Sequence, residues 1–217
     1  MIRFHALALA CLLACPALLR AGVPVTYYDT ANTASATQMR ASLNAIVSNG
    51  AVELGYSNTT QAIYAADEDP ANPNNVLLMY GRGTRAKSAS GGSNDGNALT
   101  GGWNREHMFP QSKFSSAEPM QSDIHALAPC DADVNSARLA YPYDTVASPT
   151  YTDAFGNRHN GSRWEPADVD KGRAARAILY MDVRYEGRNG EADLVVINSY
   201  PGPTGSDRKS TRLNSSH

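Results

Sequence analysis

The pattern of apolar and polar positions predicts three helices. Apolar residues recur at helical spacing in Thr37–Ser48, and Ser35 can cap the first turn of that helix. Thr59–Ala66 predicts a second, shorter helix that ends at a run of acidic residues. The longest, Asp168–Tyr185, follows Pro166 and places small and apolar residues along one side, with acids early and an arginine late, as the helix dipole favours.

Short apolar runs between turn residues predict the strands. Asn75–Tyr80 predicts a buried strand, and Leu194–Ile197 predicts a short strand or turn near the end of the readable chain. Trp103–Phe109 and Ser122–Leu127 predict the two strands of a hairpin, and Asp131 is a natural cap for a helix that follows. We therefore expect an α+β fold, a single, mostly helical domain built around this hairpin and its helix.

The two ends of the chain do not have the pattern of a folded domain. Residues 1–21 combine an early arginine with the apolar run Ala6–Leu19, too short to cross a bilayer, and predict a secretory signal peptide, with a lipoprotein signal as the alternative. Residues 207–217 lack apolar periodicity and resemble a translated sequencing adapter, so we expect a non-native tail, with an ordinary polar tail as the alternative. The folded domain is then residues 22–206, incomplete at its C-terminus.

Composition indicates one globular domain. The chain has 217 residues, 42% of them hydrophobic, and a mean hydropathy of -0.40, which excludes a disordered or membrane-spanning class. The two ends carry five of the 19 basic residues and one of the 21 acidic residues, so the body between them has a formal charge near −6. An acidic body is not typical of a duplex-binding protein, so a polyanionic ligand would need a metal or a local basic strip, for which Arg82, Arg85 and Lys87 in the predicted loop Gly81–Thr100 are candidates.

Cysteine usage predicts no disulfide. Cys11 and Cys15 lie in the predicted signal peptide, which leaves Cys130 alone in the exported chain. A lone cysteine could act as a nucleophile, but we interpret Cys130 as a small buried residue that ends a strand before a helix.

The residues that could carry chemistry gather in one central stretch. Glu106 and His107 are adjacent, Asp123 and His125 form an Asp-x-His pair, and Asn135 follows a short polar run. A carboxylate and a carboxamide oxygen are sufficient protein ligands for Mg²⁺, which keeps its other positions for water and phosphate. A neutral imidazole beside the ion is suited to act as a general base near pH 7.

Strand geometry limits how these residues can meet. Adjacent side chains on a strand point to opposite faces, so Glu106 and His107 diverge unless the strand ends or bulges between them. The neighbouring Gly101, Gly102 and Pro110 make an irregular strand end plausible. A hairpin followed by a helix would then bring His107 close to Asn135.

Two motifs in this stretch resemble the signature of the bacterial endonuclease I family. They are Trp103-Asn104-Arg105-Glu106-His107 with Pro110-Gln111-Ser112, and Ser122-Asp123-Ile124-His125-Ala126-Leu127 followed by Pro129 and Val134-Asn135-Ser136-Ala137-Arg138. The similarity extends from about Thr37 to Gly205. The family comprises periplasmic and secreted non-specific nucleases with a ββα-metal (His-Me finger) core.

The resemblance implies a bacterial periplasmic or extracellular endonuclease that hydrolyses DNA, RNA or both, with no membrane span and no obligate protein partner. It implies that His107 is the general base, that Glu106 and Asn135 hold Mg²⁺ (or Mn²⁺ or Ca²⁺), and that His125 is a framework or site-rim residue. Some members carry an arginine between the base and the metal helix; this chain has only Lys113 there, which leaves Arg105, Arg138 or no residue to contact the phosphate.

Two other functions remain open at this point. A catalytically impaired nucleic-acid-binding protein on the same fold would bind nucleic acid without cleaving it. A zinc hydrolase would use His107, His125 and Cys130, although the chain has neither an HExxH motif nor paired CxxC spacing.

Overall fold

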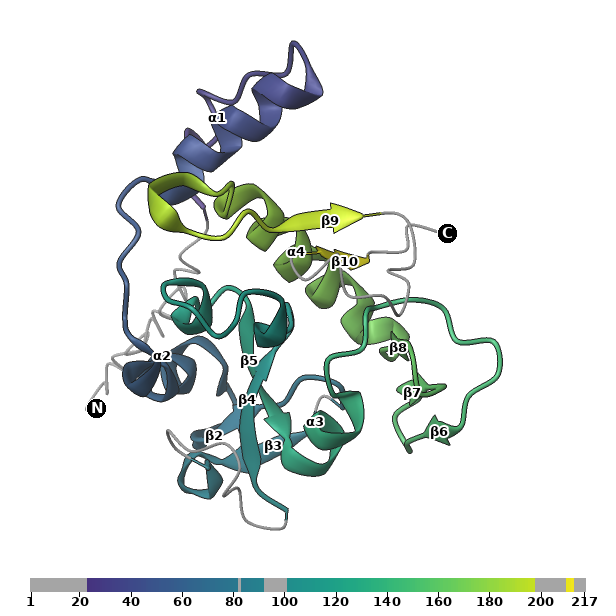
Figure 1. Ribbon diagram of the computed structural model, residues 1–217. Helices are drawn as coiled ribbons and strands as arrows, with labels where there is room; N and C mark the ends of the chain where they lie inside the picture. The colour runs from purple at the N-terminus through teal and green to yellow at the C-terminus, as the bar shows by residue number, and fades with distance from the viewer. Residues whose placement is uncertain (1–22, 82, 92–100, 198–209, 213–217) are drawn as a thin grey trace, which may run out of the picture.

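The computed structural model describes residues 23–81, 83–91, 101–197 and 210–212 of the chain (Figure 1). The predicted signal peptide and Arg82 lie outside these residues, as does most of the predicted tail. Ser210–Arg212 is the part of the predicted tail that the structure describes. It forms a strand, β10, that pairs in parallel with β9 (Val195–Ile197). Among the described residues, no helix has the length and apolar character needed to cross a bilayer.

A hairpin and a short helix lie at the centre of the fold. β4 (Trp103–His107) pairs antiparallel with β5 (Leu127–Asp131), in a regular register from Trp103↔Asp131 to His107↔Leu127. α3 (Ala132–Arg138) follows β5 directly, because the Asp131 carboxylate accepts hydrogen bonds from the backbone N–H groups of Asp133 and Val134 and so caps the helix. The same carboxylate pairs with Arg85 at 2.9 Å, which ties the start of α3 to β3 (Thr84–Ala86).

Three small sheets surround the hairpin (Figure 1). The first is an antiparallel sheet of β1 (Glu68–Asp69), β2 (Asn72–Leu77) and β3 (Thr84–Ala86), and the second an antiparallel sheet of β6 (Tyr151–Thr152), β7 (Arg158–His159) and β8 (Trp164–Glu165). The parallel pair of β9 and β10 is the third. A backbone bridge between Met79 and Cys130 joins the segment after β2 to β5.

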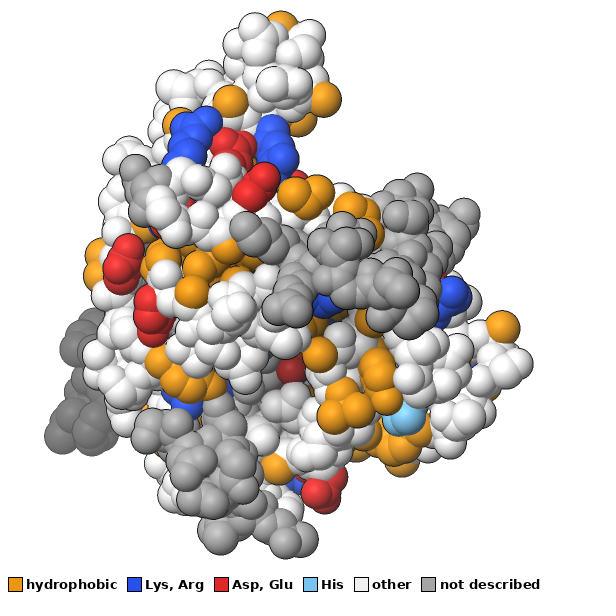
Figure 2. Space-filling view, viewed as in Figure 1, with side chains coloured by type: hydrophobic (Ala, Val, Ile, Leu, Met, Phe, Trp, Pro, Cys, Tyr) orange, Lys and Arg blue, Asp and Glu red, His pale blue; other side chains and the backbone are white. Residues whose placement is uncertain are grey.

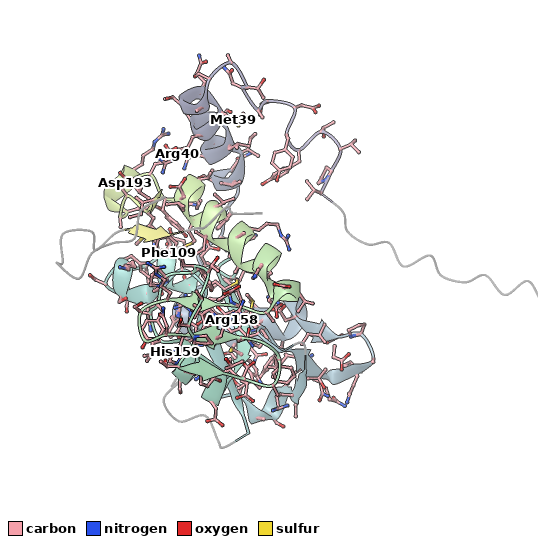
Figure 3. All side chains as sticks on the ribbon, turned by 90° about the vertical axis from the view of Figure 1, so that its right-hand side faces the viewer. Met39, Arg40, Phe109, Arg158, His159 and Asp193 are labelled. Carbon is pink, nitrogen blue, oxygen red and sulfur yellow. The ribbon has the colours of Figure 1, made fainter. Side chains whose placement is uncertain are left out.

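Three further helices lie outside the hairpin and α3 (Figure 1). α1 (Ala36–Ser48) is capped by Ser35, α2 (Thr59–Ala66) precedes the first sheet, and α4 (Asp168–Arg184) buries one face that includes Ile178 and Met181. α1 packs on α4, and Figure 2 shows cationic and anionic side chains gathered where the two meet. Arg40 of α1 pairs there with Asp182, Glu186 and Asp193, and Figure 3 shows Arg40 near Asp193.

Apolar residues form two clusters. The larger contains Phe109, Trp164, Ile178 and Met181, and the smaller gathers α2 and β2 residues around Trp103. Both strands of the hairpin contribute to the clusters, and every residue of β4 is buried. Polar side chains on β4 must therefore find partners inside the protein, since an unpartnered buried polar group is costly.

Several sequence expectations are confirmed and others are wrong. The helices match closely, and Cys130 is buried in β5 as interpreted. The fold is mixed α+β rather than mostly helical, because 36% of the described residues are helical and 21% are extended. Most of the strands have only two or three residues. Ser122–Leu127 is not a strand: its residues lie in a 3-10 turn (Met120–Ser122) and a second turn, and β5 begins at Leu127. The predicted loop Gly81–Thr100 contains β3 and a 3-10 turn (Lys87–Ala89).

Candidate active site

The two faces of β4 separate the candidate residues into two groups. Asn104 and Glu106 point towards α3, where they contact Asn135 and Arg138. Arg105 and His107 point the other way, towards Tyr56 in the 3-10 turn Tyr56–Asn58 that precedes α2. No bulge interrupts the pairing of β4 with β5, so the divergence expected of neighbouring strand residues is retained.

Glu106 is the centre of a buried polar network. Its Oε1 accepts a hydrogen bond of 2.7 Å from the Tyr80 hydroxyl and lies 2.9 Å from Nε of Arg138. The Arg138 Nε–H lacks the alignment of a hydrogen bond, so charge holds this pair together. Burial raises the pKa of Glu106, and the Arg138 charge and the Tyr80 hydrogen bond oppose that shift.

Arg138 is fixed on all sides. Its terminal nitrogens donate to the backbone oxygens of Met108 (3.0 Å) and Leu139 (2.6 Å), and its guanidinium lies 4.9 Å from the ring centre of Tyr143. The Tyr143 hydroxyl makes a short hydrogen bond with that of Tyr80, which closes the network on Glu106. Burial, the largest cause, raises the pKa of Tyr143 to about 12, so the phenol stays protonated at neutral pH.

Asn135 is oriented by the strand it faces. Its Nδ2 donates to Oδ1 of Asn104 at 2.7 Å and to the backbone oxygen of Arg105 at 3.5 Å. Both acceptors bind the carboxamide nitrogen of Asn135, so its carboxamide oxygen points away from these two acceptors.

Two oxygens on this side of β4 are of the type that a hard cation binds. Within the described part of the chain, no group donates to Oε2 of Glu106 or to Oδ1 of Asn135. One carboxylate oxygen and one carboxamide oxygen are the kind of sparse, all-oxygen set that Mg²⁺ accepts, with water and phosphate completing its shell. Zn²⁺ needs three or more His, Cys, Asp or Glu side chains around one point. Among the described residues, no such group is placed to hold a metal ion.

His107 is held in one ring orientation. Nε2 lies 3.0 Å from the backbone oxygen of Gln121, and the ring stacks on Tyr56 with centroids 5.5 Å apart. A carbonyl can only accept, so Nε2 carries the proton and the lone pair of the neutral ring is on Nδ1. The sequence implies a base at His107, and this tautomer is compatible with one.

Neither candidate arginine is exposed. The Arg105 guanidinium lies 3.6 Å from the ring centre of Tyr56 and donates to Tyr56 O (2.6 Å) and to Oγ1 of Thr59 (2.9 Å). Arg105 is 2% exposed and Arg138 1% exposed. Both guanidiniums are engaged with groups of the protein itself.

His125 contacts Asp123 and Tyr180, and its place on the rim of the site stays a prediction. Its side chain is 66% exposed, stacks on Tyr180, and hydrogen-bonds through Nδ1 to Asp123 at 3.0 Å, which raises the pKa of His125. Asp123 also accepts from the hydroxyls of Tyr180 (2.9 Å) and Tyr185 (2.8 Å). The zinc triad of His107, His125 and Cys130 is not formed, because Cys130 is buried in the core while His125 faces solvent.

Two of the three loop cations are engaged in ion pairs. Arg85 binds Asp131, and Lys87 binds Glu68 at 2.6 Å. These contacts hold β3 and the turn after it against the rest of the fold. Arg82 lies outside the described residues, and the phosphate-contacting strip considered from the sequence stays a prediction.

Sequence reasoning missed three partners of the candidate residues. Asn104 could have been found, because it lies two residues before Glu106 and must share its face of the strand. Tyr80 and Tyr143 carry no local signal, since they reach Glu106 and Arg138 only through the tertiary fold.

Comparison with known proteins places the chain in a family. Residues 35–201 match the family described as Endonuclease I. The chain is 46% identical over 171 residues to an extracellular ribonuclease of Bacillus amyloliquefaciens, an alignment that covers 78% of this chain and 56% of the relative. It is 41% identical over 171 residues to an extracellular ribonuclease of Bacillus subtilis (strain 168), covering 78% of this chain and 57% of the relative.

The chain thus spans little more than half the length of these relatives. No solved structure is significantly similar to it. The family match covers most of the chain, including β4, β5, α3 and every candidate residue discussed above. The chain belongs to the endonuclease I family.

Proposed function

We propose that this protein is a secreted, metal-dependent endonuclease that hydrolyses phosphodiester bonds in RNA, DNA or both. The observation that carries the proposal is the pair of oxygens, Glu106 Oε2 and Asn135 Oδ1, beside a strand whose last residue is an oriented histidine. Family membership supplies the reaction class, and the relatives' names as extracellular ribonucleases support export and RNA as a substrate.

In this proposal Glu106 and Asn135 hold Mg²⁺. A bound Mg²⁺ would neutralise charge on the scissile phosphate and stabilise the departing oxygen. Tyr80 and Arg138 bind the other carboxylate oxygen and so fix the direction of Oε2, while Asn104 fixes the carboxamide of Asn135. Pre-oriented ligands matter, because Mg²⁺ tolerates little departure from octahedral geometry.

His107 would accept the proton of the attacking water at Nδ1. The bond from Nε2 to Gln121 O fixes the tautomer, as a base of this type requires, and stacking on Tyr56 fixes the ring. Because His107 and Glu106 lie on opposite faces, a phosphate could meet both only beyond the end of β4. Arg138 and Arg105 act as positioning residues, since both guanidiniums are buried and already engaged.

A water nucleophile does not require a 2′-hydroxyl, so this mechanism admits DNA as well as RNA. The alternative function, a nucleic-acid-binding protein without activity, is favoured by the ion pair of Glu106 with Arg138, which competes with a metal for the carboxylate.

The test is incubation of the full chain with circular plasmid and with structured RNA, with Mg²⁺ or with excess EDTA, beside His107→Ala and Glu106→Gln. We expect linear and shorter products only with Mg²⁺, and activity of both variants lower by at least about 100-fold, the scale of a lost general base. Binding without cleavage by the unaltered chain would support the alternative. Cleavage that persists in EDTA or in a folded His107→Ala variant would refute the mechanism.

A further inference from the structure

A column of aromatic rings crosses the sheet of β6, β7 and β8. Tyr151, His159 and Trp164 are paired across the three strands, so their side chains share one face. The Tyr151 and His159 rings are nearly parallel, 8° apart with centroids at 4.9 Å, and the His159 and Trp164 rings follow at 6.2 Å and 29°. Such spacing is that of offset stacked rings.

The column runs from the core to an open edge. Trp164 is fully buried, while His159 and Tyr151 are partly exposed. Tyr151 lies on β6, the edge strand, and both of its ring contacts, to His159 and Trp164, are with the column. No other ring among residues 23–81, 83–91, 101–197 and 210–212 stacks on Tyr151. Figure 2 shows a histidine among apolar side chains at the surface in the region of β6 and β7, and Figure 3 labels His159.

The column lies beside the candidate active site. Tyr141, whose ring is 5.3 Å from that of His159, follows Arg138 by three residues. Val134 and Ala137 of α3 pack on the same apolar cluster as Tyr151. A strand of nucleic acid bound at Glu106 and Asn135 would therefore pass close to the rings.

The charge around Tyr151 selects the part of a nucleic acid that could bind. After burial, the negative charges of Asp153 and Asp131 are the next causes that raise the pKa of the Tyr151 phenol. An electronegative surface repels phosphates, so a duplex, which presents its backbones outwards, is disfavoured there. An unpaired base can stack on a flat ring whatever its sequence, because every base has a π-face.

We propose that Tyr151 and His159 form a stacking site for an unpaired base of a single-stranded nucleic acid. This inference rests on the proposed function for its substrate class, and it names single strands, or unpaired regions of folded RNA, as the preferred substrate. A base on the outer face of Tyr151 extends the column by one ring. Tyr151 acts through its ring face, so its hydroxyl is dispensable.

The test measures binding separately from cleavage. A short single-stranded oligonucleotide carrying 2-aminopurine is titrated with the full chain in EDTA, and the fluorescence quenching that stacking produces gives the affinity. Tyr151→Phe keeps the ring, and Tyr151→Leu keeps apolar volume without a π-face. Phe155→Leu is the matched control, because Phe155 is an exposed ring on the same hairpin, 57% accessible and outside the column. Thermal melting checks that each variant is folded.

We expect Tyr151→Phe and Phe155→Leu to bind like the unaltered chain, and Tyr151→Leu to bind about 5- to 100-fold more weakly with less quenching, the range for loss of one stacked base. Equal affinity of Tyr151→Leu and Tyr151→Phe, or absence of binding by the unaltered chain, would overturn the stacking site. Cleavage with Mg²⁺ is assayed in parallel. If the unaltered chain cleaves but Tyr151→Leu binds the oligonucleotide as tightly as the unaltered chain, only the stacking site is refuted. If Tyr151→Leu binds more weakly but the unaltered chain does not cleave, only the proposed nuclease activity is refuted.

Discussion

Arg138 and Glu106 form an ion pair inside the protein, with Nε 2.9 Å from Oε1 and side chains only 1% and 3% exposed. Removing one partner of such a pair leaves a buried charge without compensation, which usually costs more than the pair contributed. This relationship determines both the stability of the core and the direction of the carboxylate.

The first prediction concerns this ion pair. Arg138→Met should lower the free energy of unfolding by about 3 kcal/mol, because Glu106 loses its counter-charge. Urea denaturation measures the change. The double variant Arg138→Met/Glu106→Gln should recover part of the lost free energy of unfolding, because the carboxamide that replaces the Glu106 carboxylate carries no charge. An exposed ion pair contributes up to about 1 kcal/mol. If the free energy of unfolding of Arg138→Met lies within that amount of the value for the unaltered chain, the ion pair does not stabilise the fold as a buried pair would.

The second prediction concerns the Tyr80 hydroxyl. Tyr80→Phe should cost about 1 to 2 kcal/mol of stability, because Glu106 and Tyr143 each lose a hydrogen bond. It should also weaken Mn²⁺ binding, measured by calorimetry, since Oε2 is no longer held in one direction. Tyr64→Phe is the control: its hydroxyl donates to Lys87 O, away from the site, so the ion affinity should not change.

The third prediction concerns ion binding and thermal stability. A ligand that binds only the folded state stabilises it, by about 2.7 kcal/mol at 100 times its Kd. Saturating Mg²⁺ should therefore raise the melting temperature of the unaltered chain, and Asn135→Ala should abolish that increase. Asn44→Ala removes another buried carboxamide, which donates to Val183 and Arg184, and should lower the melting temperature while keeping the Mg²⁺ response. An increase that survives in Asn135→Ala would exclude this residue as a ligand.

The fourth prediction is a histidine titration. The hydrogen bond from His125 Nδ1 to Asp123 raises the pKa of His125. Burial acts to raise the pKa of Asp123, but the hydrogen bonds from His125 and Tyr185 lower the pKa of Asp123 overall. In Asp123→Asn the pKa of His125 should fall back towards its ordinary value, as followed by NMR of the ring protons. The charged form of His125 is favoured in the fold, so its contribution to stability is complete below its unfolded pKa and is lost as pH rises through the folded pKa. An unchanged titration would show that Asp123 does not govern His125.

The fifth prediction concerns acid stability. Burial acts to raise the pKa of Glu165, but hydrogen bonds from Arg158, the Val146 backbone and Lys171 lower it to about 2. A carboxyl with a lowered folded pKa stabilises the protein above its unfolded value, about 4.5, and loses that contribution as pH falls towards 2. The free energy of unfolding of Glu165→Gln should therefore depend less on pH between these values. An identical slope in the two proteins would contradict the lowered pKa.

The first strand of the hairpin and the helix after it could be predicted because their signals are local. Asp131 caps α3 from within three residues, and the alternation of β4 fixes which of its residues share a face. What β4 contacts could not be predicted, since Tyr80 is 26 positions from Glu106 and Arg138 is 32. The expectation that one ion lies between His107 and Asn135 depends on such distant contacts and stays a prediction.

The failed strand at Ser122–Leu127 has a physical cause. Apolar and polar residues alternate there as in a strand, but the Asp123 carboxylate accepts from the backbone N–H of His125, two residues on, and so forms a turn. Hydrogen bonds from Tyr180 and Tyr185 of α4 and the residue after it stabilise the turn. A tertiary contact about 60 positions away overrides the local pattern.

The brevity of α3 has a consequence for how the protein matures. Seven residues are too few for a helix to persist in water without neighbours. Asn135 and Arg138 therefore depend for their orientations on the pairing of β4 with β5 and on the ion pair of Arg85 with Asp131. Under the proposed function, an unfolded chain would carry these residues without the arrangement that we propose for cleavage.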